Sequence, residues 1–368
     1  MAYVIGIDFG NAYSFAAAIS CKDGIVCKDE TALWLVPSNM LKGYPSVLHV
    51  NNEGRKTYGL SAINELPLKN RRHLIKNHIC SSEEICGYSI NYDEEIVNLI
   101  KYIADNANEI LKQKTGETTN LVSIAYPLFY MDYQADRLIE LLQNVILETG
   151  ESIQVIGKIK EPAAASLAFL SDIDTGSMGK YNTVLVFSMG ETTFDASIVT
   201  LHHAPDGSFK SIDVIDSEEA YCAGYFYTRA VVKLIEKALL SRGVDPLDTR
   251  EHSARLWIEA DTMKQVLDKE KSVRYEYRNH TVEVTKQEYE RAVDALLNWS
   301  INLTNNVYRR KAIEPAKIIM VGGQSKMPII RKRLVETFPS IGEQNIILFK
   351  PYQAIAEGAA RYGAILHK

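Results

Sequence analysis

Three glycine-containing turns in this sequence carry the residue types that hold phosphate groups. They are DFGNAYS at residues 8–14, SMGETTFD at residues 188–195 and VGGQSKMP at residues 321–328. Each follows an apolar run that is typical of a buried strand. Glycine lets backbone amides approach an anion closely, and nearby carboxylates suit a hard cation. One such turn is usually a plain turn, but three in one chain favour a phosphate site.

Two of these turns belong to an internal repeat. VIGIDFGNAYSFAAAI at residues 4–19 resembles VLVFSMGETTFDASIV at residues 184–199, and the alignment places Asp8 on Ser188. Each copy reads as a buried strand, a glycine turn and a second strand of small residues. Two similar hairpins half a chain apart predict two similar lobes with a ligand in the cleft between them.

The composition is that of a globular protein that works without a nucleic-acid or membrane surface. The chain has 368 residues, of which 46% are hydrophobic and 24% charged, and its net charge is −5. This length predicts two domains or lobes. No apolar run reaches the ~18 residues that span a bilayer. The five cysteines form no CxxC pair, and the chain opens directly on a predicted strand, so we expect a cytoplasmic protein with reduced thiols.

Alternating helices and strands must position the glycine turns. Residues 121–127 predict a buried strand, and Pro162 predicts a helix start within EPAAASLAFL. The longer amphipathic patterns and the small-residue pattern near the end predict helices at residues 132–148, 253–270, 286–309 and 354–366.

Taken together, the motifs resemble those of one protein family. The order of motifs is similar to that of the ATPase domain of Hsp70-type chaperones, within the actin, hexokinase and Hsp70 superfamily. The resemblance runs from end to end. It is carried by GIDFGNAYS at 6–14, YPSVLHV at 44–50, EPAAASLA at 161–168, FxxGxxTFD at 187–195, VGGxSxxP at 321–328 and KPYQAIAEGAA at 350–360.

The resemblance implies an α/β fold of two lobes around a nucleotide cleft, each lobe with a core and a peripheral subdomain. Lobe I then covers residues 1–175, with its peripheral subdomain at about 47–101. Lobe II covers residues 176–345, with its peripheral subdomain at about 219–293. Residues 346–368 return as a helix to lobe I.

The resemblance also implies roles at the phosphoryl end of the cleft. Asp8 matches the aspartate near Mg²⁺, and Glu161 matches the glutamate that handles the waters of that ion. Asp195 is retained from the second turn. Arg72 falls where the family has a catalytic lysine, and Arg71 takes that role if the alignment slips by one. Ser188 replaces a family aspartate and removes a carboxylate beside the metal.

Several of the implied phosphate contacts are altered. In the first loop two family threonines are replaced by Asn11 and Ala12, and in the second two family glycines are replaced by Glu191 and Thr192. Side chains then protrude where backbone would hold phosphate, and the glutamate would repel it. The contacts implied by the resemblance are Gly10, Asn11, Ala12, Tyr13, Gly190, Thr193, Ala223 and Gly224.

The implied nucleoside contacts are better kept. Asp261 and Lys264 match residues that touch the ribose, whereas Gln265 and Lys326 replace arginines that stack on adenine. Lysine stacks less well than arginine on an aromatic base. The implied contacts are Asp261, Lys264, Gln265, Asp268, Gly322, Gly323, Gln324 and Lys326.

These replacements predict a degenerate ATPase. Losing one preorganised polar group typically costs ~10²–10³ in rate, and at least three are changed here. We expect a domain that binds ATP or ADP, with Mg²⁺, weakly, structurally or not at all, and that acts through a J-domain protein or another Hsp70-type chaperone. The features GN after Asp8 and Arg72 resemble the Hsp70-like subunit of the ribosome-associated complex. An Hsp110-like exchange factor is the neighbouring alternative.

Three other functions stay open at this stage. One is a slow but active Mg²⁺-dependent ATPase with a normal Hsp70 cycle. The others are a sugar kinase and an actin-like filament protein of the same superfamily. Neither of these last two is favoured by the order of the motifs. Sugar-stimulated ADP production or pelleting on nucleotide addition would detect them.

Overall fold

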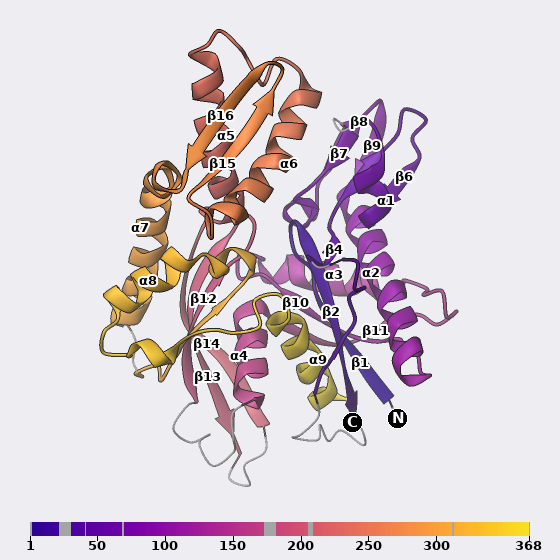
Figure 1. The fold of residues 1–368 in the computed structure, drawn as a ribbon. Coiled ribbons are helices and arrows are strands. Elements are labelled where there is room, and N and C mark those ends of the chain that lie inside the picture. Colours follow the sequence, from indigo (N-terminus) through magenta and orange to yellow (C-terminus); the bar gives the residue numbers. More distant parts are fainter. Residues whose placement is uncertain are drawn as a thin grey trace.

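The computed structural model places two α/β lobes side by side, with smaller outer parts above them (Figure 1). It describes residues 2–21, 31–40, 42–67, 70–172, 182–204, 209–310 and 313–367. Its described strands are β1 Ala2–Asp8, β2 Tyr13–Cys21, β3 Leu33–Trp34, β4 Tyr44–Pro45, β5 Leu48–Val50, β6 Lys56–Tyr58, β7 Arg71–Arg72, β8 Ser82–Ile85, β9 Tyr88–Asn91, β10 Leu121–Tyr126, β11 Gln154–Lys160, β12 Thr183–Met189, β13 Phe194–His203, β14 Phe209–Ala220, β15 Ser272–Tyr277, β16 His280–Thr285, β17 Ile318–Val321 and β18 Ile346–Leu348.

The helices connect and cover these strands. The described α-helices are α1 Gly59–Asn64, α2 Tyr92–Thr115, α3 Asp132–Leu142, α4 Glu161–Ser171, α5 Gly224–Leu240, α6 Arg250–Leu267, α7 Lys286–Arg310, α8 Pro328–Thr337 and α9 Ala354–Leu366. The short 3₁₀ helices that matter below are η2 Ile75–His78 and η4 Gly323–Lys326.

The two main sheets repeat one arrangement. The first has the order β11-β10-β1-β2-β3, with β4 also paired to β2, and the second has the order β14-β13-β12-β17-β18. In each sheet the glycine-turn hairpin is antiparallel and its first strand has a parallel neighbour, β10 or β17. The predicted repeat of two hairpins is therefore confirmed. Asp8 lies opposite Phe15 in one hairpin, and Ser188 lies opposite Asp195 in the other.

Two small-residue helices join the sheets. Helices α4 and α9 lie between the lobes in Figure 1, and one apolar core cluster draws on both helices and both sheets. The two helices pack so closely that a Cβ atom added to Gly358 of α9 would lie 1.7 Å from the carbonyl oxygen of Ala164 in α4. The alanine- and glycine-rich sequences of these helices thus bring the two lobes together. Helix α9 also packs on β1.

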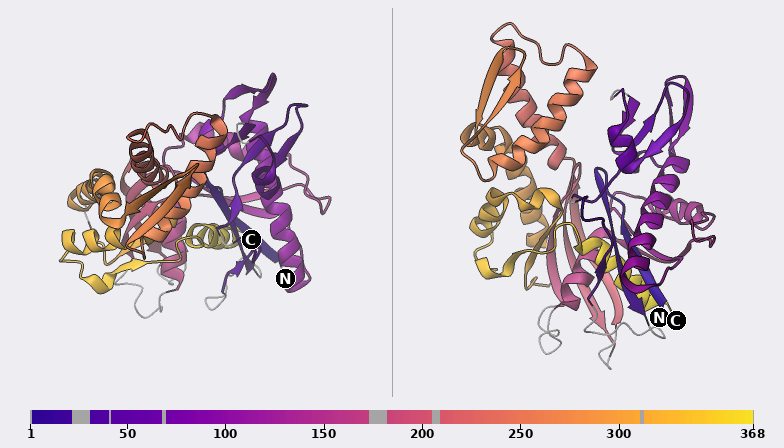
Figure 2. Two further views of the ribbon diagram at one scale, coloured as in Figure 1. Left: turned by 45° about the horizontal axis from the view of Figure 1, so that its top comes forward. Right: turned by 45° about the vertical axis from the view of Figure 1, so that its right-hand side comes forward.

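The outer parts rise from the far ends of the two lobes (Figure 2). Elements β5 to β9 with α1 stand on the first lobe, and α5, α6, β15 and β16 stand on the second. They fall mainly within the ranges 47–101 and 219–293 that we predict for peripheral subdomains. The subdomain boundaries stay a prediction, and the predicted lobe boundary at residues 175 and 176 lies outside the described residues.

One predicted helix is shorter than expected. The helix predicted at 132–148 ends at Leu142, because the Asn144 side chain donates to the Glu140 carbonyl oxygen at 3.0 Å and the chain turns. A bridge between Ile146 and Ser152 then replaces the last predicted turn. The predicted helices at 253–270 and 286–309 are present as α6, which begins and ends three residues earlier, and α7, which ends one residue later.

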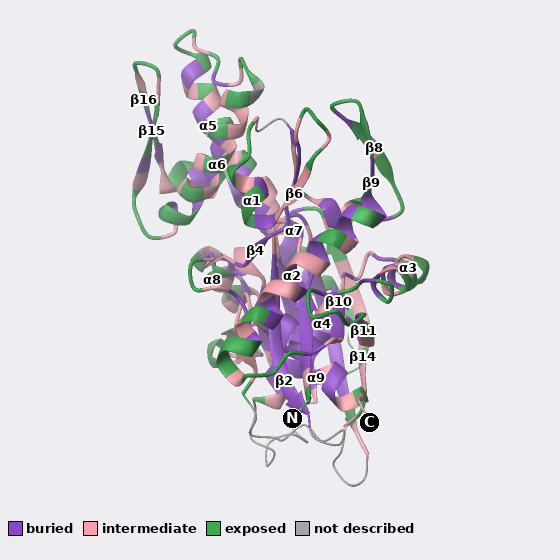
Figure 3. Cartoon of the chain, turned by 90° about the vertical axis from the view of Figure 1, so that its right-hand side faces the viewer, coloured by how far each residue is buried: buried purple, intermediate pink, exposed green. Residues whose placement is uncertain are grey.

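Burial follows this arrangement. Figure 3 shows the buried residues gathered in the two sheets and in α4 and α9, while exposed residues lie on the outer elements. Burial on both faces explains the continuous apolar runs of β1, β2, β12 and β13, and wide apolar stripes explain the long helices. Among the described residues, no helix combines the length and the apolarity that a membrane crossing requires.

Candidate functional site

A cavity of about 390 Å³ lies between the two lobes. It is lined by the three glycine turns, by α6 and by the segment before α9. The predicted site residues that line it are Asp8, Gly10, Asn11, Ala12, Tyr13, Glu161, Ser188, Gly190, Thr193, Asp261, Lys264, Gln265, Asp268, Gly322, Gly323, Gln324 and Lys326. Residues at distant points of the sequence therefore meet at one cleft, as the repeat predicts.

Four predicted site residues do not line this cavity. Asp195 lies behind Ser188 on the neighbouring strand, and Arg72 lies in β7. Ala223 and Gly224 are buried at the start of α5. Arg72 pairs with Glu83, and the Gly224 amide is bonded to the Gly190 carbonyl oxygen, so neither residue faces the cavity.

The buried acids of the site repel one another. Burial and, to a smaller extent, the nearby Glu161 raise the pKa of Asp8 to about 7, although Lys76 opposes the shift. Burial and Glu161 also raise the pKa of Asp195 to about 8, against hydrogen bonds from Ser188 and Ser197. A rise of this kind means that the carboxylates lack enough positive charge around them.

Lys76 lines the cavity beside Glu161, and sequence reasoning missed it. Its ammonium pairs with Glu161, and both side chains are nearly buried in the cavity wall. Leu74, which directly precedes η2, has a positive φ of 62°, and this turns the chain into η2 and sends Lys76 inward. The hydroxyl of Tyr130 donates to the Lys76 carbonyl oxygen at 2.7 Å and holds this turn.

Arg72 lies in β7 and does not line the cavity, in contrast to its predicted position in the cleft. Its Nε atom lies 2.5 Å from Oε1 of Glu83, in the outer part of lobe I. Lys76 is four residues further along the same NRRHLIK segment. The sequence therefore contained a further basic residue near Arg72 as a candidate, but the change of chain direction at Leu74 could not be predicted from the sequence.

The two glycine loops that face each other are joined by their side chains. The Asn11 amide nitrogen donates to the Thr192 hydroxyl at 2.7 Å, across the cleft between the lobes. Both residues are buried. Gly10 is required for the first turn, because an added Cβ would lie 2.1 Å from the Tyr13 carbonyl oxygen. The replaced positions in the two loops thus form a direct bridge.

The second loop also covers the start of α5. The Gly224 amide donates to the Gly190 carbonyl oxygen at 3.1 Å, and the Tyr225 amide donates to that of Glu191 at 2.5 Å. A Cβ added to Gly224 would lie 3.1 Å from Oε2 of Glu191. The first amides of α5 are therefore used within the protein, and the predicted phosphate contacts of Ala223 and Gly224 are not formed at the cavity wall.

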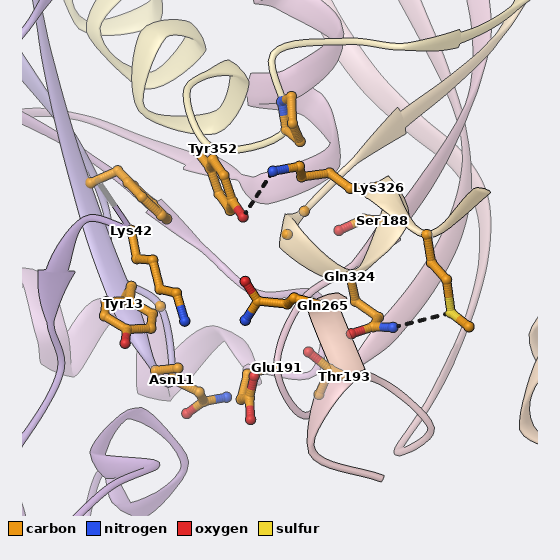
Figure 4. A pocket seen from close by; sticks show the side chains of 18 of the residues that line it. Asn11, Tyr13, Lys42, Ser188, Glu191, Thr193, Gln265, Gln324, Lys326 and Tyr352 are labelled. Atoms are coloured by element: carbon orange, nitrogen blue, oxygen red, sulfur yellow. Dashed lines mark hydrogen bonds between the residues drawn. The ribbon is translucent and has the colours of Figure 1, made fainter. Parts of the chain in front are cut away.

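Glu191 brings a carboxylate to this end of the cavity. Figure 4 shows its side chain beside that of Asn11, at the end opposite Tyr352 and Lys326. Burial raises the pKa of Glu191, and Lys264 only partly offsets that rise. Because the described residues offer this carboxylate no hydrogen-bond donor, the local charge does not suit a phosphate group.

The other end of the cavity presents groups that suit a nucleoside. Lys42 and Lys264 reach Asp261 at 3.2 and 3.0 Å. Burial alone would raise the pKa of Asp261, but the two lysines outweigh it and lower the pKa. The Lys326 ammonium lies 4.9 Å from the centre of the Tyr352 ring, and Phe15 stacks on the same ring at 5.6 Å.

The feature of the site that bears on metal binding is the presence of buried carboxyl groups, not a cluster of side chains arranged as metal ligands. Among the described residues, no cluster of three or more His, Cys, Asp or Glu side chains could hold an ion directly. The raised pKa values of Asp8 and Asp195 nevertheless show carboxylates that a hard cation would stabilise. The residues present fit a nucleoside and a cation held through its waters, but Glu191 does not fit a phosphate chain.

Comparison with known proteins identifies the family. Residues 82–368 match the family described as Hsp70 protein. This is most of the chain, so the chain belongs to the Hsp70 family. The mixed α/β architecture with its two repeated sheets is the fold of the actin and Hsp70-like ATPases, and the predicted fold class is confirmed.

The similar curated proteins are chaperones. The chaperone protein HscA homolog of Haemophilus influenzae (strain PittGG) is 23% identical over 98% of this chain and 57% of that protein. The chaperone protein DnaK of Metamycoplasma hominis is 24% identical over 99% of this chain and 59% of that protein. DnaK of Thermosipho africanus (strain TCF52B) is 25% identical, with coverage of 99% and 59%. The chain therefore spans less than three fifths of the length of these relatives.

Proposed function

We propose that this chain is an Hsp70-type nucleotide-binding domain that binds an adenine nucleotide weakly and hydrolyses ATP slowly or not at all. Family membership supports the nucleotide, and Asp8, Asp261 and the two glycines of the third turn are the residues that would hold it with Mg²⁺. The cytoplasm is the proposed location. The similar DnaK and HscA proteins are chaperones, which supports a chaperone role here.

The observation that carries the loss of hydrolysis is the pair formed by Ser188 and Asp195. The first is a hydroxyl in place of a carboxylate, and the second has its pKa raised to about 8. The pair therefore supplies less negative charge than two carboxylates would, and in the absence of a cation the Asp195 carboxyl is largely protonated at neutral pH and a weak base for orienting a water molecule. Since phosphoryl transfer depends on positioning and electrostatics, we expect a large loss of rate.

Calorimetry and a single-turnover assay on one sample test this proposal. The chain is stripped of nucleotide, titrated with ATP in the presence of Mg²⁺, and then incubated in excess over labelled ATP. We expect binding and no ADP formation above the uncatalysed rate. The variant Ser188→Asp returns the carboxylate, and Ser211→Asp on the outer face of β14 is the matched control. Clear turnover by the unchanged chain would refute the proposal.

A slow but active ATPase is the second candidate, and one observation favours it. Lys76 lies in the cleft beside Glu161, so the site retains a buried cation where phosphoryl transfer needs one. Under this alternative the chain forms ADP with Mg²⁺, and Lys76→Met abolishes that turnover while Arg72→Met leaves it unchanged. The same single-turnover assay separates the two candidates.

The proposed partners are a J-domain protein or another Hsp70-type chaperone, including one that acts at the ribosome. The chain covers 57% of the similar HscA protein and 59% of the similar DnaK protein, so these partners are proposed from family membership. Affinity capture with the intact cleft, followed by identification of bound J-domain proteins and ribosomal subunits, tests this point.

A further inference from the structure

We infer that the cavity prefers a nucleoside that carries no phosphate over the corresponding di- and triphosphates. This inference rests on the proposed function, since it takes an adenine compound as the ligand. It goes further by assigning the chemical class of the ligand from the two ends of the cavity. The nucleoside end is lined by rings and charge-paired polar groups, whereas the phosphate end is occupied by side chains of the protein.

The bridge between the glycine loops narrows the path that a phosphate chain would need. Asn11 and Thr192 come from opposite lobes and are joined at 2.7 Å, and both are buried. The remaining oxygen of Asn11, Oδ1, is buried and has no hydrogen-bond partner among the described residues. A buried acceptor of this kind needs a donor.

Glu191 adds a second acceptor at the same place. It directly precedes Thr192, and its carboxylate lies against Gly224 at the start of α5. Phosphate oxygens are acceptors and carry negative charge at neutral pH, so they can satisfy neither group. A free ribose hydroxyl, by contrast, can donate a hydrogen bond to the Glu191 carboxylate.

Two of the lysines that line the cavity are already bound by the protein. Lys76 pairs with Glu161, and Lys264 contacts Asp261, the Gly224 carbonyl oxygen and the hydroxyl of Thr228. Neither ammonium can turn to a phosphate group without breaking a buried contact. The amides at the start of α5 are also used, by the carbonyl oxygens of residues 190 and 191.

Calorimetry with a series of ligands tests the preference. Adenosine, AMP, ADP and ATP are each titrated into the nucleotide-stripped chain at fixed ionic strength, with and without Mg²⁺. We expect affinity to fall along the series, with adenosine binding at least about tenfold more tightly than ATP. Equal or tighter binding of ATP with Mg²⁺ would overturn the inference.

The outcomes separate this inference from the proposed function. Tighter ATP binding without turnover overturns only the nucleoside preference. A preference for adenosine together with ATP turnover supports the inference and refutes the loss of hydrolysis. If none of the four ligands binds, both the preference and the proposed nucleotide binding are wrong.

A variant tests the physical cause. Glu191→Gln removes the charge and keeps the shape, so we expect ATP affinity to rise about tenfold while adenosine affinity changes less than about twofold. Glu336→Gln on the exposed face of α8 is the matched control, and it should change neither value. Asn11→Ala, which removes the bridge, is a second variant and should also favour ATP. Unchanged ratios in both site variants would refute the cause.

Discussion

At the scale of single residues, Lys76 and Arg72 show how position decides the role of a basic side chain. Lys76 is 5% exposed and pairs with Glu161, whereas the Arg72 and Glu83 side chains are both about one-third exposed. Removing one partner of a buried ion pair leaves an uncompensated charge, and removing one partner of an exposed pair costs little.

We therefore predict different losses of stability for two matched variants. Lys76→Met should lower the free energy of unfolding by about 3 kcal/mol, because Glu161 would stay buried without a partner. Arg72→Met should cost less than about 1 kcal/mol. Urea unfolding monitored by circular dichroism measures both. Equal losses would show that Lys76 is not held in the wall of the cleft.

Asp195 predicts a pH dependence. Its pKa is raised by burial and by Glu161 to about 8 from about 4 in the unfolded chain. Between these values the folded chain binds a proton that the unfolded chain has released, so the contribution of this residue to stability falls as pH rises toward 8. Asp195→Asn removes this loss.

The measurement is the difference in melting temperature between Asp195→Asn and the unchanged chain. It should grow in favour of the variant from pH 5 to pH 9. Glu84→Gln, at an exposed position of β8, is the control and should show no such trend. A difference that stays constant with pH would contradict the assigned protonation of Asp195.

At the scale of elements, the contact of α4 with α9 depends on a missing side chain. Gly358 lies against the Ala164 carbonyl oxygen, where an added Cβ would sit 1.7 Å away. Neither backbone can yield easily, because both helices pack on the sheets of the two lobes. Small residues at this crossing are thus required by distance rather than by helix propensity.

Gly358→Ala should therefore destabilise the chain by about 3 kcal/mol, from overpacking between two helices. Gly150→Ala is the control, because its φ of 89° disfavours alanine but nothing lies within 4 Å of the added atom. It should cost only about 1 kcal/mol. Thermal and urea unfolding measure both variants. A smaller loss for Gly358→Ala than for the control would mean that the helices can separate.

At the scale of the whole molecule, the described contacts that hold the lobes across the cleft include a buried hydrogen bond and an ion pair. The hydrogen bond is the bridge from Asn11 to Thr192, and the ion pair is that of Lys42 with Asp261 at 3.2 Å. The ion pair joins the first lobe to α6 of the second. Its side chains are 41% and 32% exposed, so its own contribution is small, but reversing one charge adds repulsion.

Lys42→Glu should therefore loosen the cleft without unfolding the chain. We expect faster amide hydrogen exchange in peptides that cover α6 and the residues around Tyr13, by about threefold to tenfold. Lys332→Glu on α8 is the control, because Lys332 is exposed and lies on an outer helix. Unchanged exchange at α6 would show that the ion pair does not help to close the cleft.

The sequence by itself determined the hairpin repeat, the helices α4, α6, α7 and α9, and most of the residues that line the cleft. These features depend on patterns that are local in the chain: a strand followed by a glycine turn, a proline at a helix start, and small residues in α4 and α9. Motifs in a fixed order also determined the family, since the match covers residues 82–368.

Only the tertiary structure decided which side chains face one another. A turn at Leu74 sends Lys76 rather than Arg72 into the cleft, and the loop at Glu191 covers Gly224. The bridge of Asn11 to Thr192 joins residues that are 181 positions apart. Such contacts depend on the backbone direction at a single residue and on how two lobes meet. Neither leaves a periodic signal along the chain, because side-chain patterns report which face is buried and not what lies across it.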